Sequence, residues 1–158
     1  MKGSDKLIAM LNDLLADELT AINQYMVHSE MCDGWGYQKL HKSIEMRAIQ
    51  EMKHAEKLIG RILFLEGTPN VSQLKPIHIG PDIAKQFAND KQAEVAALGL
   101  YNKAVSMARD LSDEGTRDML GSILKDEEAH LDWLDSQLDQ IAQVGVQNYL
   151  AAQLRKAE

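Results

Sequence analysis

Glu51-Met52-Lys53-His54 and Glu127-Glu128-Ala129-His130 are two copies of one motif, Glu-x-x-His, placed 76 residues apart (127 − 51 = 76). Residues three apart lie on the same face of a helix, so each copy can direct a carboxylate and an imidazole to one point in space. The two motifs together predict a helical protein with a metal site.

The repeat extends beyond the two motifs. Glu18 recurs as Glu94 at the same offset (94 − 18 = 76). The tyrosine two turns later repeats as well, because Tyr25 recurs as Tyr101 (101 − 25 = 76). We therefore interpret the chain as two similar helical hairpins, each supplying one lone glutamate, one tyrosine and one Glu-x-x-His.

Apolar residues recur at helical spacing in four long segments. The expected starts of these segments are Ser4 or Asp5, the residues after the turn Gly34-Trp35-Gly36, Pro81-Asp82, and the residues after the turn 112–115. Residues 67 to 81 lack this spacing, and a connection of that length can cross a bundle from end to end and leave the second and third helices parallel. The amphipathic tail predicts a short fifth helix, which needs its own bundle or another subunit as a packing partner.

The sequence thus predicts an all-α protein with one domain over residues 1–158. We expect a four-helix bundle at about 4–142, with a long crossover between helices 2 and 3, and a short C-terminal helix at about 146–156. Charged residues give a net charge of −7, which argues against nucleic acid as the main partner. Cys32 is the only cysteine, and the N-terminal residues predict neither a signal peptide nor a membrane span, so we expect a cytoplasmic protein.

One Glu-x-x-His alone is more often a solvated helix face than a site. Here, however, each of the four helices carries a glutamate inside its apolar stripe, where an unpaired carboxylate is costly. Two divalent cations would balance the four negative charges, and two neutral imidazoles would complete the ligand set. Carboxylate and imidazole ligands without thiolate suit iron or manganese, and zinc can compete.

At these residues the sequence resembles the bacterioferritins, and the resemblance covers essentially the whole chain. It implies a ferritin-like fold and a ferroxidase site in which each side chain binds iron. Glu51 and Glu127 would bridge two irons, Glu18 and Glu94 would be terminal carboxylates, and His54 and His130 would each bind one iron. Animal-type ferritins lack the paired motifs, and rubrerythrins usually add a thiolate iron domain that one cysteine cannot build.

The resemblance also implies a function and partners. The protein would store iron by oxidising Fe(II) with O2 or H2O2 and keeping the ferric mineral inside a hollow shell of about 24 subunits built from dimers. Haem b would bind once per two subunits through Met52, and a ferredoxin is a candidate reductant for mineral release. Some members bind an extra iron through a histidine and an aspartate where this chain has Met46 and Gln50, so that inner-wall site is not expected.

Several residues to which the resemblance assigns a functional role could instead be purely structural. Met52 could simply be a packing residue, although on a helix it is turned about 100° from Glu51 and can face a neighbouring subunit. The apolar haem pocket could include residues that would serve equally in a core or a dimer interface: Leu19, Ile22, Asn23, Met26 and Ile49. Tyr25 and Tyr101 could hydrogen-bond the metal-site carboxylates, and Trp133 could relay an electron or be purely structural.

His28, His41 and His78 show no partner pattern and are expected at the surface or in packing. Two other functions remain open from the residues: a bundle that binds haem or sequesters iron or zinc, and a dimetal oxidase or oxygenase acting on an organic substrate.

Overall fold

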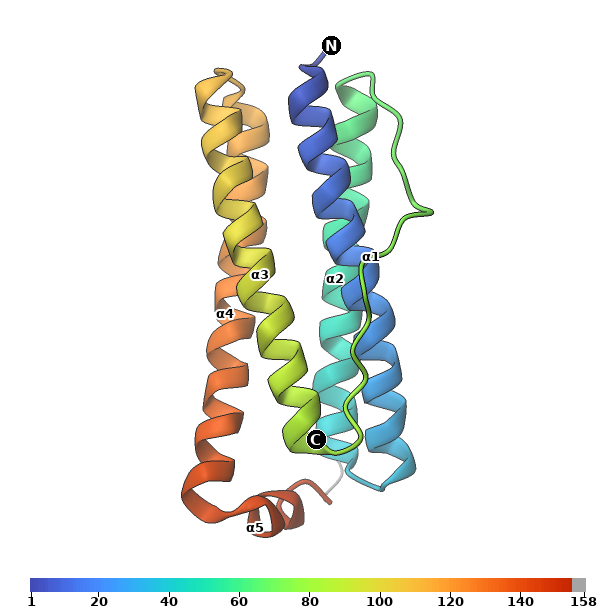
Figure 1. The fold of residues 1–158 in the computed structure, drawn as a ribbon, viewed down its shortest axis with the longest axis vertical. Helices are drawn as coiled ribbons and strands as arrows, with labels where there is room; N and C mark the ends of the chain where they lie inside the picture. The colour runs from blue at the N-terminus through green and yellow to red at the C-terminus, as the bar shows by residue number, and fades with distance from the viewer. Residues whose placement is uncertain (155–158) are drawn as a thin grey trace.

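The computed structural model of the protein describes residues 1–154 and consists of helices and connecting segments. The described residues form four long helices and a short fifth one. Figure 1 shows the long helices side by side and the short helix across one end of them. Their bounds are α1 Asp5–Gly34, α2 Gln38–Phe64, α3 Ile83–Asp110, α4 Glu114–Val144 and α5 Val146–Ala151. Residues 1–154 contain no strand, as expected for an all-α protein.

Side chains cap three of the helix N-termini. Ser4 Oγ accepts a hydrogen bond from the backbone N–H of Leu7 at 3.4 Å, and Asp82 accepts one from Lys85 at 2.8 Å. Asp113 caps α4 through the N–H of Thr116 at 3.0 Å. Each cap satisfies an N–H that has no partner inside its helix, which fixes where the helix begins.

The topology is that of two antiparallel hairpins. α1 packs on α2, and α3 packs on α4. After Leu65 the chain runs back along the full length of α1 before α3 begins, so α2 and α3 point the same way (Figure 1). The predicted crossover between the second and third helices is therefore confirmed.

Side chains on one stripe of α1 hold this crossover in place. Thr20 Oγ1 accepts from the N–H of Lys75 at 2.8 Å, and Gln24 Oε1 accepts from the N–H of His78 at 3.1 Å. One turn further on, His28 Nε2 accepts from the N–H of Gly80 at 3.0 Å. Residues four apart share a helix face, so α1 supplies acceptors at regular intervals to a segment without regular structure of its own.

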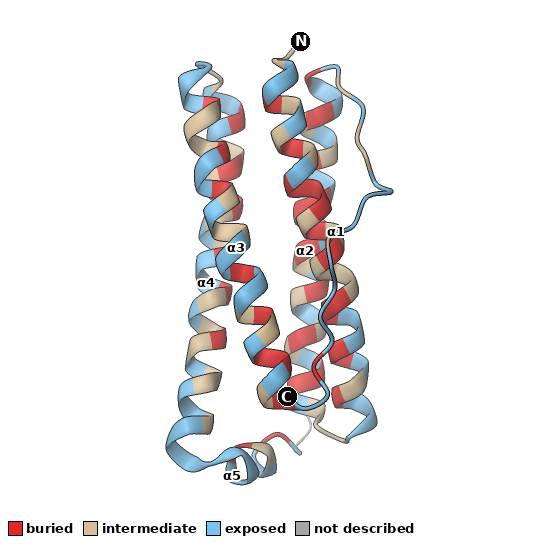
Figure 2. Cartoon of the chain, in the orientation of Figure 1, coloured by how far each residue is buried: buried red, intermediate tan, exposed pale blue. Residues whose placement is uncertain are grey.

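Apolar residues fill the interior at both ends of the bundle. Figure 2 shows buried residues distributed along the long helices. One cluster lies towards the start of α1 and includes Leu11, Leu58 and Leu120. The other lies towards the end of α1 and includes Phe87 and Leu134. The glutamates of the sequence repeat lie between these two clusters along each helix.

α5 folds back onto its own bundle. Gly145 has φ +82°, a left-handed conformation that glycine adopts without strain, and it separates α4 from α5. Tyr149 is only 2% exposed and donates a hydrogen bond from its hydroxyl to Gln137 Oε1 at 2.6 Å. The helix begins at the predicted residue but ends at Ala151, earlier than expected, and residues 155–156 of the prediction lie outside the described part. Among residues 1–154, no helix combines the length and apolarity needed to cross a membrane.

Candidate metal centre

All four long helices contribute to one buried polar cluster at mid-height in the bundle. Its six members are each 1–2% exposed: Glu18, Glu51, His54, Glu94, Glu127 and His130. These are the six residues proposed as ligands from the sequence repeat, and the fold brings all six together. Their role as iron ligands stays a prediction.

The six residues divide into two groups that share two members. The first group is Glu18, Glu51, His54 and Glu127, and the second is Glu51, Glu94, Glu127 and His130. Within each group, one ligand atom per residue lies within 4.8 Å of the others. Because Glu51 and Glu127 belong to both groups, the geometry suits two neighbouring ions joined by two carboxylates.

Several buried ligand atoms have no hydrogen-bond partner within the described structure. They are Glu18 Oε2, Glu94 Oε2, Glu127 Oε2 and His130 Nδ1. His130 Nδ1 lies 2.9 Å from Glu94 Oε1 but is not aligned for a hydrogen bond. Unsatisfied buried polar atoms are costly and rare, and four of the five side-chain atoms of this kind in the described chain lie in this cluster. Cations between these atoms would satisfy them.

The two tyrosines bind the glutamates of the opposite hairpin. The Tyr25 hydroxyl on α1 donates to Glu94 Oε1 on α3, and the Tyr101 hydroxyl on α3 donates to Glu18 Oε1 on α1 at 2.5 Å. Burial raises the pKa of both tyrosines, and the nearby carboxylates raise it further. Both phenols therefore stay protonated, and each fixes the orientation of one carboxylate.

Without metal, the cluster reduces its charge by holding protons. Burial raises the pKa of Glu94 to about 8, and the neighbouring Glu127 adds to this effect. Burial, followed by the charge of Glu18, raises the pKa of Glu51 well above its ordinary value. Burial alone would lower the pKa of His54, but its contacts with Glu127 and Glu18 raise it to about 10. Metal ions would have to displace these protons.

The two histidines are not held in the same way. His54 Nδ1 lies 2.9 Å from Glu127 Oε1, and its other nitrogen lies 2.9 Å from Asp126 Oδ2. A carboxylate on the second nitrogen orients a metal-binding imidazole. By the repeat offset, the counterpart of Asp126 is Gln50 (126 − 76 = 50), which accepts a hydrogen bond from Arg47 instead. The sequence reasoning missed Asp126, although the offset could have drawn attention to this difference.

The cluster can be reached from two sides. A cavity of about 230 Å³ between α1, α3 and the crossover is lined by Glu18, Glu94 and Glu127, and by Lys75 from the crossover. On the α2 and α4 side, a cleft of about 710 Å³ is lined by His54 and Asp126. Trp133, also in this cleft, lies with its ring 6.4 Å from the His130 ring.

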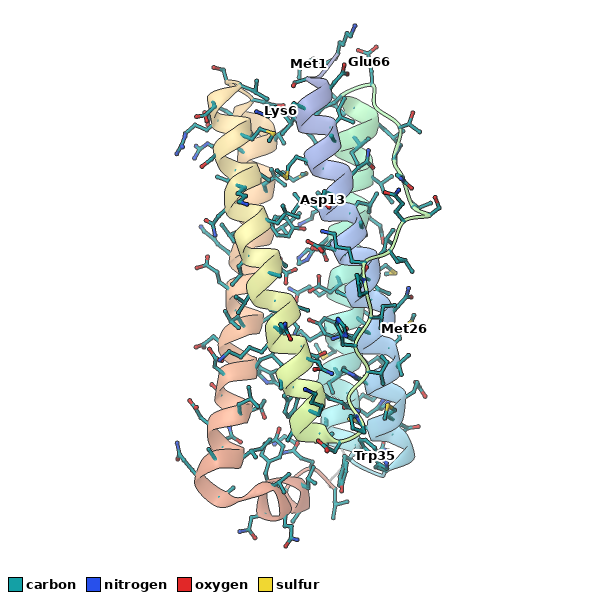
Figure 3. The ribbon with its side chains drawn as sticks, in the orientation of Figure 1. Met1, Lys6, Asp13, Met26, Trp35 and Glu66 are labelled. Atoms are coloured by element: carbon teal, nitrogen blue, oxygen red, sulfur yellow. The ribbon has the colours of Figure 1, made fainter. Side chains whose placement is uncertain are left out.

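Met52 is exposed beside the buried Glu51, as its position on the helix predicts. Its exposed fraction is 44%, and it lines a groove of about 340 Å³ with Ile22, Met26 and Ile49. Figure 3 shows Met26 on the side of α1 that points away from the rest of the bundle. We call this surface the Met52 groove. Leu19 and Asn23, also expected there, are not among its lining residues.

The remaining histidines differ from one another. His78 is exposed, as expected. His28 is fully buried and contacts Asp90 at 3.0 Å as well as the crossover. His41 is also buried and contacts Ser29. No sequence pattern predicts these contacts, because the partners of His28 and His41 lie on other segments at irregular separations.

The comparisons with known proteins agree with this geometry. The profile of the ferritin-like domain matches residues 8–144. Bacterioferritin from Brucella melitensis is 39% identical over 94% of this chain and 92% of its own length, and bacterioferritin from Rhodobacter capsulatus is 40% identical over the same shares. A bacterial ferritin from Synechocystis is 40% identical over 98% of this chain and 99% of its own length. Together with the buried six-residue cluster, these similarities show that the chain belongs to the bacterioferritin family of ferritin-like proteins.

Proposed function

We propose that the protein is an iron-storage ferroxidase that binds Fe(II) in pairs at the six-residue cluster and oxidises it for storage as ferric mineral. The observation that carries this proposal is the pair of ligand groups that share Glu51 and Glu127. Two ferrous ions held side by side can deliver two electrons to one molecule of O2 or H2O2. Iron is the substrate here, and the family relationship supports storage as its destination.

Electrostatics favour the oxidised product. Four carboxylates offset the charge of two Fe(II) ions, and the added positive charge of Fe(III) is stabilised by the same anionic ligands. Tyr25 and Tyr101 remain protonated and hold the outer carboxylates Glu94 and Glu18 in place. The chain thus contributes position and charge, while the electrons come from iron.

The opening on the α1 and α3 side suits small substrates. The cavity of about 230 Å³ on the α1 and α3 side is smaller than the roughly 300–1,000 Å³ of typical organic ligand pockets. At this entrance the size favours metal ions and small oxidants over an organic substrate, whereas the cleft of about 710 Å³ on the other side falls within the organic-ligand range. We assign this cavity as the way in for Fe(II), and the cleft on the α2 and α4 side as the way towards the mineral.

The Met52 groove fits one half of a haem site. It offers an exposed thioether among apolar side chains, and Met52 together with its copy in a two-fold related subunit would hold the iron of haem b. Bound haem would supply a redox centre for electrons that reduce the mineral. We further propose that such dimers assemble into a shell of about 24 subunits. A ferredoxin would donate the electrons, and the protein would be cytoplasmic.

The test combines particle analysis with oxidation kinetics. Purified full-length protein should sediment as a large shell that contains iron. Anaerobic protein mixed with Fe(II) and then O2 should show a rapid oxidation phase that saturates at two Fe(II) per subunit, as the two ligand groups require. Iron binding without a rapid phase would favour sequestration over ferroxidase activity and would refute the proposal.

A further inference from the structure

A third group of metal-ligand side chains lies near the far end of the first hairpin. Glu30 on α1 and His41 and Glu45 on α2 each place a ligand atom within 4.8 Å of the other two. His41 and Glu45 are four residues apart and therefore share one helix face. His41 precedes Glu51 by ten residues, about 15 Å along α2, so this group is separate from the six-residue cluster.

The hydrogen bonds of His41 determine which ring nitrogen can bind a metal. Its Nδ1 lies 3.0 Å from the backbone carbonyl oxygen of Ser29, which can only accept. The Ser29 hydroxyl donates to the carbonyl oxygen of His41 at 3.1 Å, so it too is placed to accept from Nδ1. Nδ1 therefore carries the hydrogen, and in the neutral ring Nε2 carries the lone pair.

Nε2 faces the carboxylate of Glu45 and has no hydrogen-bond partner in the described chain. His41 is only 9% exposed, and the distance from Nε2 to Glu45 Oε2 is 3.6 Å, too long for a hydrogen bond. Metal-binding histidines typically donate their other N–H to a backbone carbonyl or carboxylate, as His41 does. Lys42 lies 3.6 Å from Glu45 Oε1, which leaves Oε2 for another cation.

We propose that His41 Nε2 and the carboxylates of Glu30 and Glu45 bind one divalent transition-metal ion, with Zn(II) the best fit. One imidazole and two carboxylates leave a fourth tetrahedral position for water, a ligand set that zinc accepts. Mg(II) and Ca(II) prefer sites made of oxygen ligands alone, so the imidazole disfavours them.

An ion bound by Glu30 and Glu45 would change the charge at the edge of the Met52 groove. Glu30 and Glu45 also line the Met52 groove, so their negative charges border an apolar surface. A divalent ion would offset both charges, and this lowers the cost of covering the groove with another apolar surface.

Zn(II) binding to the assembled full-length protein tests the proposal. Crystals soaked in Zn(II) should show an anomalous-scattering peak about 2.0–2.1 Å from His41 Nε2, the usual Zn–N distance. In calorimetric titrations, Glu45→Gln should bind one Zn(II) fewer per subunit, or bind it at least about tenfold more weakly. Glu45 is partly exposed, so this change leaves the buried His41 contacts in place.

Glu56→Gln is the matched control, because Glu56 is an exposed glutamate on the same helix outside all three ligand groups. It removes the same charge and should bind Zn(II) as the unmodified protein does. Equal Zn(II) stoichiometry and affinity in Glu45→Gln, or no anomalous peak at His41 when the six-residue cluster is filled, would overturn the proposal. Neither result depends on iron oxidation, so this test is independent of the ferroxidase assay.

Discussion

Metal binding to the six-residue cluster should release protons, because the metal-free cluster holds protons that the ligands must lose. At pH 6.5, His54 with a pKa of about 10 and Glu94 with a pKa of about 8 both carry a proton. The raised pKa of Glu51 points to a third. Filling the site should therefore release about two to three protons per subunit.

The raised pKa values determine how metal affinity changes with pH. The protonated ligands compete with metal, so affinity rises with pH until pH passes the pKa of each group. Two to three protons correspond to a gain of about 3–4 kcal/mol in binding free energy per pH unit near pH 6.5, at about 1.4 kcal/mol per proton and pH unit. Above about pH 8, Glu94 no longer contributes and the slope should decrease.

Calorimetry measures the number of protons released on metal binding. Fe(II) is titrated anaerobically into Glu45→Gln protein, which removes the proposed third site, in buffers of different ionisation enthalpy at pH 6.5. The slope of observed heat against ionisation enthalpy gives the protons released. Glu128→Gln is a suitable control, because Glu128 is exposed beside Glu127 and its loss should leave the number unchanged. Fewer than one proton per filled site would refute the reasoning.

Four further predictions concern the site, the groove and the tail. Glu127→Ala should slow rapid Fe(II) oxidation by at least about 100-fold in stopped-flow absorbance, because the change removes a carboxylate shared by both ligand groups. The helical circular dichroism should persist. A normal oxidation rate would contradict the assignment of Glu127 as a shared ligand. Met52→Leu should abolish haem binding, measured by absorbance after reconstitution with haem. Leucine has nearly the same volume as methionine, so packing should be preserved and ferroxidase activity retained. Unchanged haem binding at one per two subunits would exclude Met52 as the ligand. Truncation after Gly145 should leave the ligand cluster intact but weaken the shell in sedimentation, and an unchanged particle with a full mineral core would exclude an assembly role. Because Tyr149 is buried, Tyr149→Ala alone should cost about 3–5 kcal/mol in denaturant unfolding, and a cost below about 1 kcal/mol would show that its packing contributes little.

Much of the fold was predictable because it depends on local pattern. Helix starts follow capping residues such as Ser4 and Asp82, and the four buried glutamates were visible as polar residues inside apolar stripes. The 76-residue offset added the information that the two hairpins are alike. Together these patterns were sufficient to predict the bundle and to select the six residues that the fold brings together.

The contacts that were not predictable depend on how helices and crossover are placed around one another. The sequence indicated that the tyrosines could bind carboxylates, but not that each would bind the glutamate of the other hairpin. Asp126 sits beside a ligand motif, yet its contact with His54 depends on the spacing of α2 and α4. The burial of His28 requires the crossover path, which has no periodicity from which to infer it.

The attachment of the crossover to α1 has a consequence for hydrogen exchange. Loop amides normally exchange with solvent quickly, because they open without disturbing the core. The N–H groups of Lys75, His78 and Gly80 instead donate to α1 side chains spaced one helical turn apart. These three amides should exchange slowly and nearly together, because the crossover must lift away from α1 to expose them. The neighbouring residues Gln73 and Leu74 are exposed, and their amides should exchange orders of magnitude faster. The crossover would therefore be protected like a helix at three amides and exchange like a loop between them.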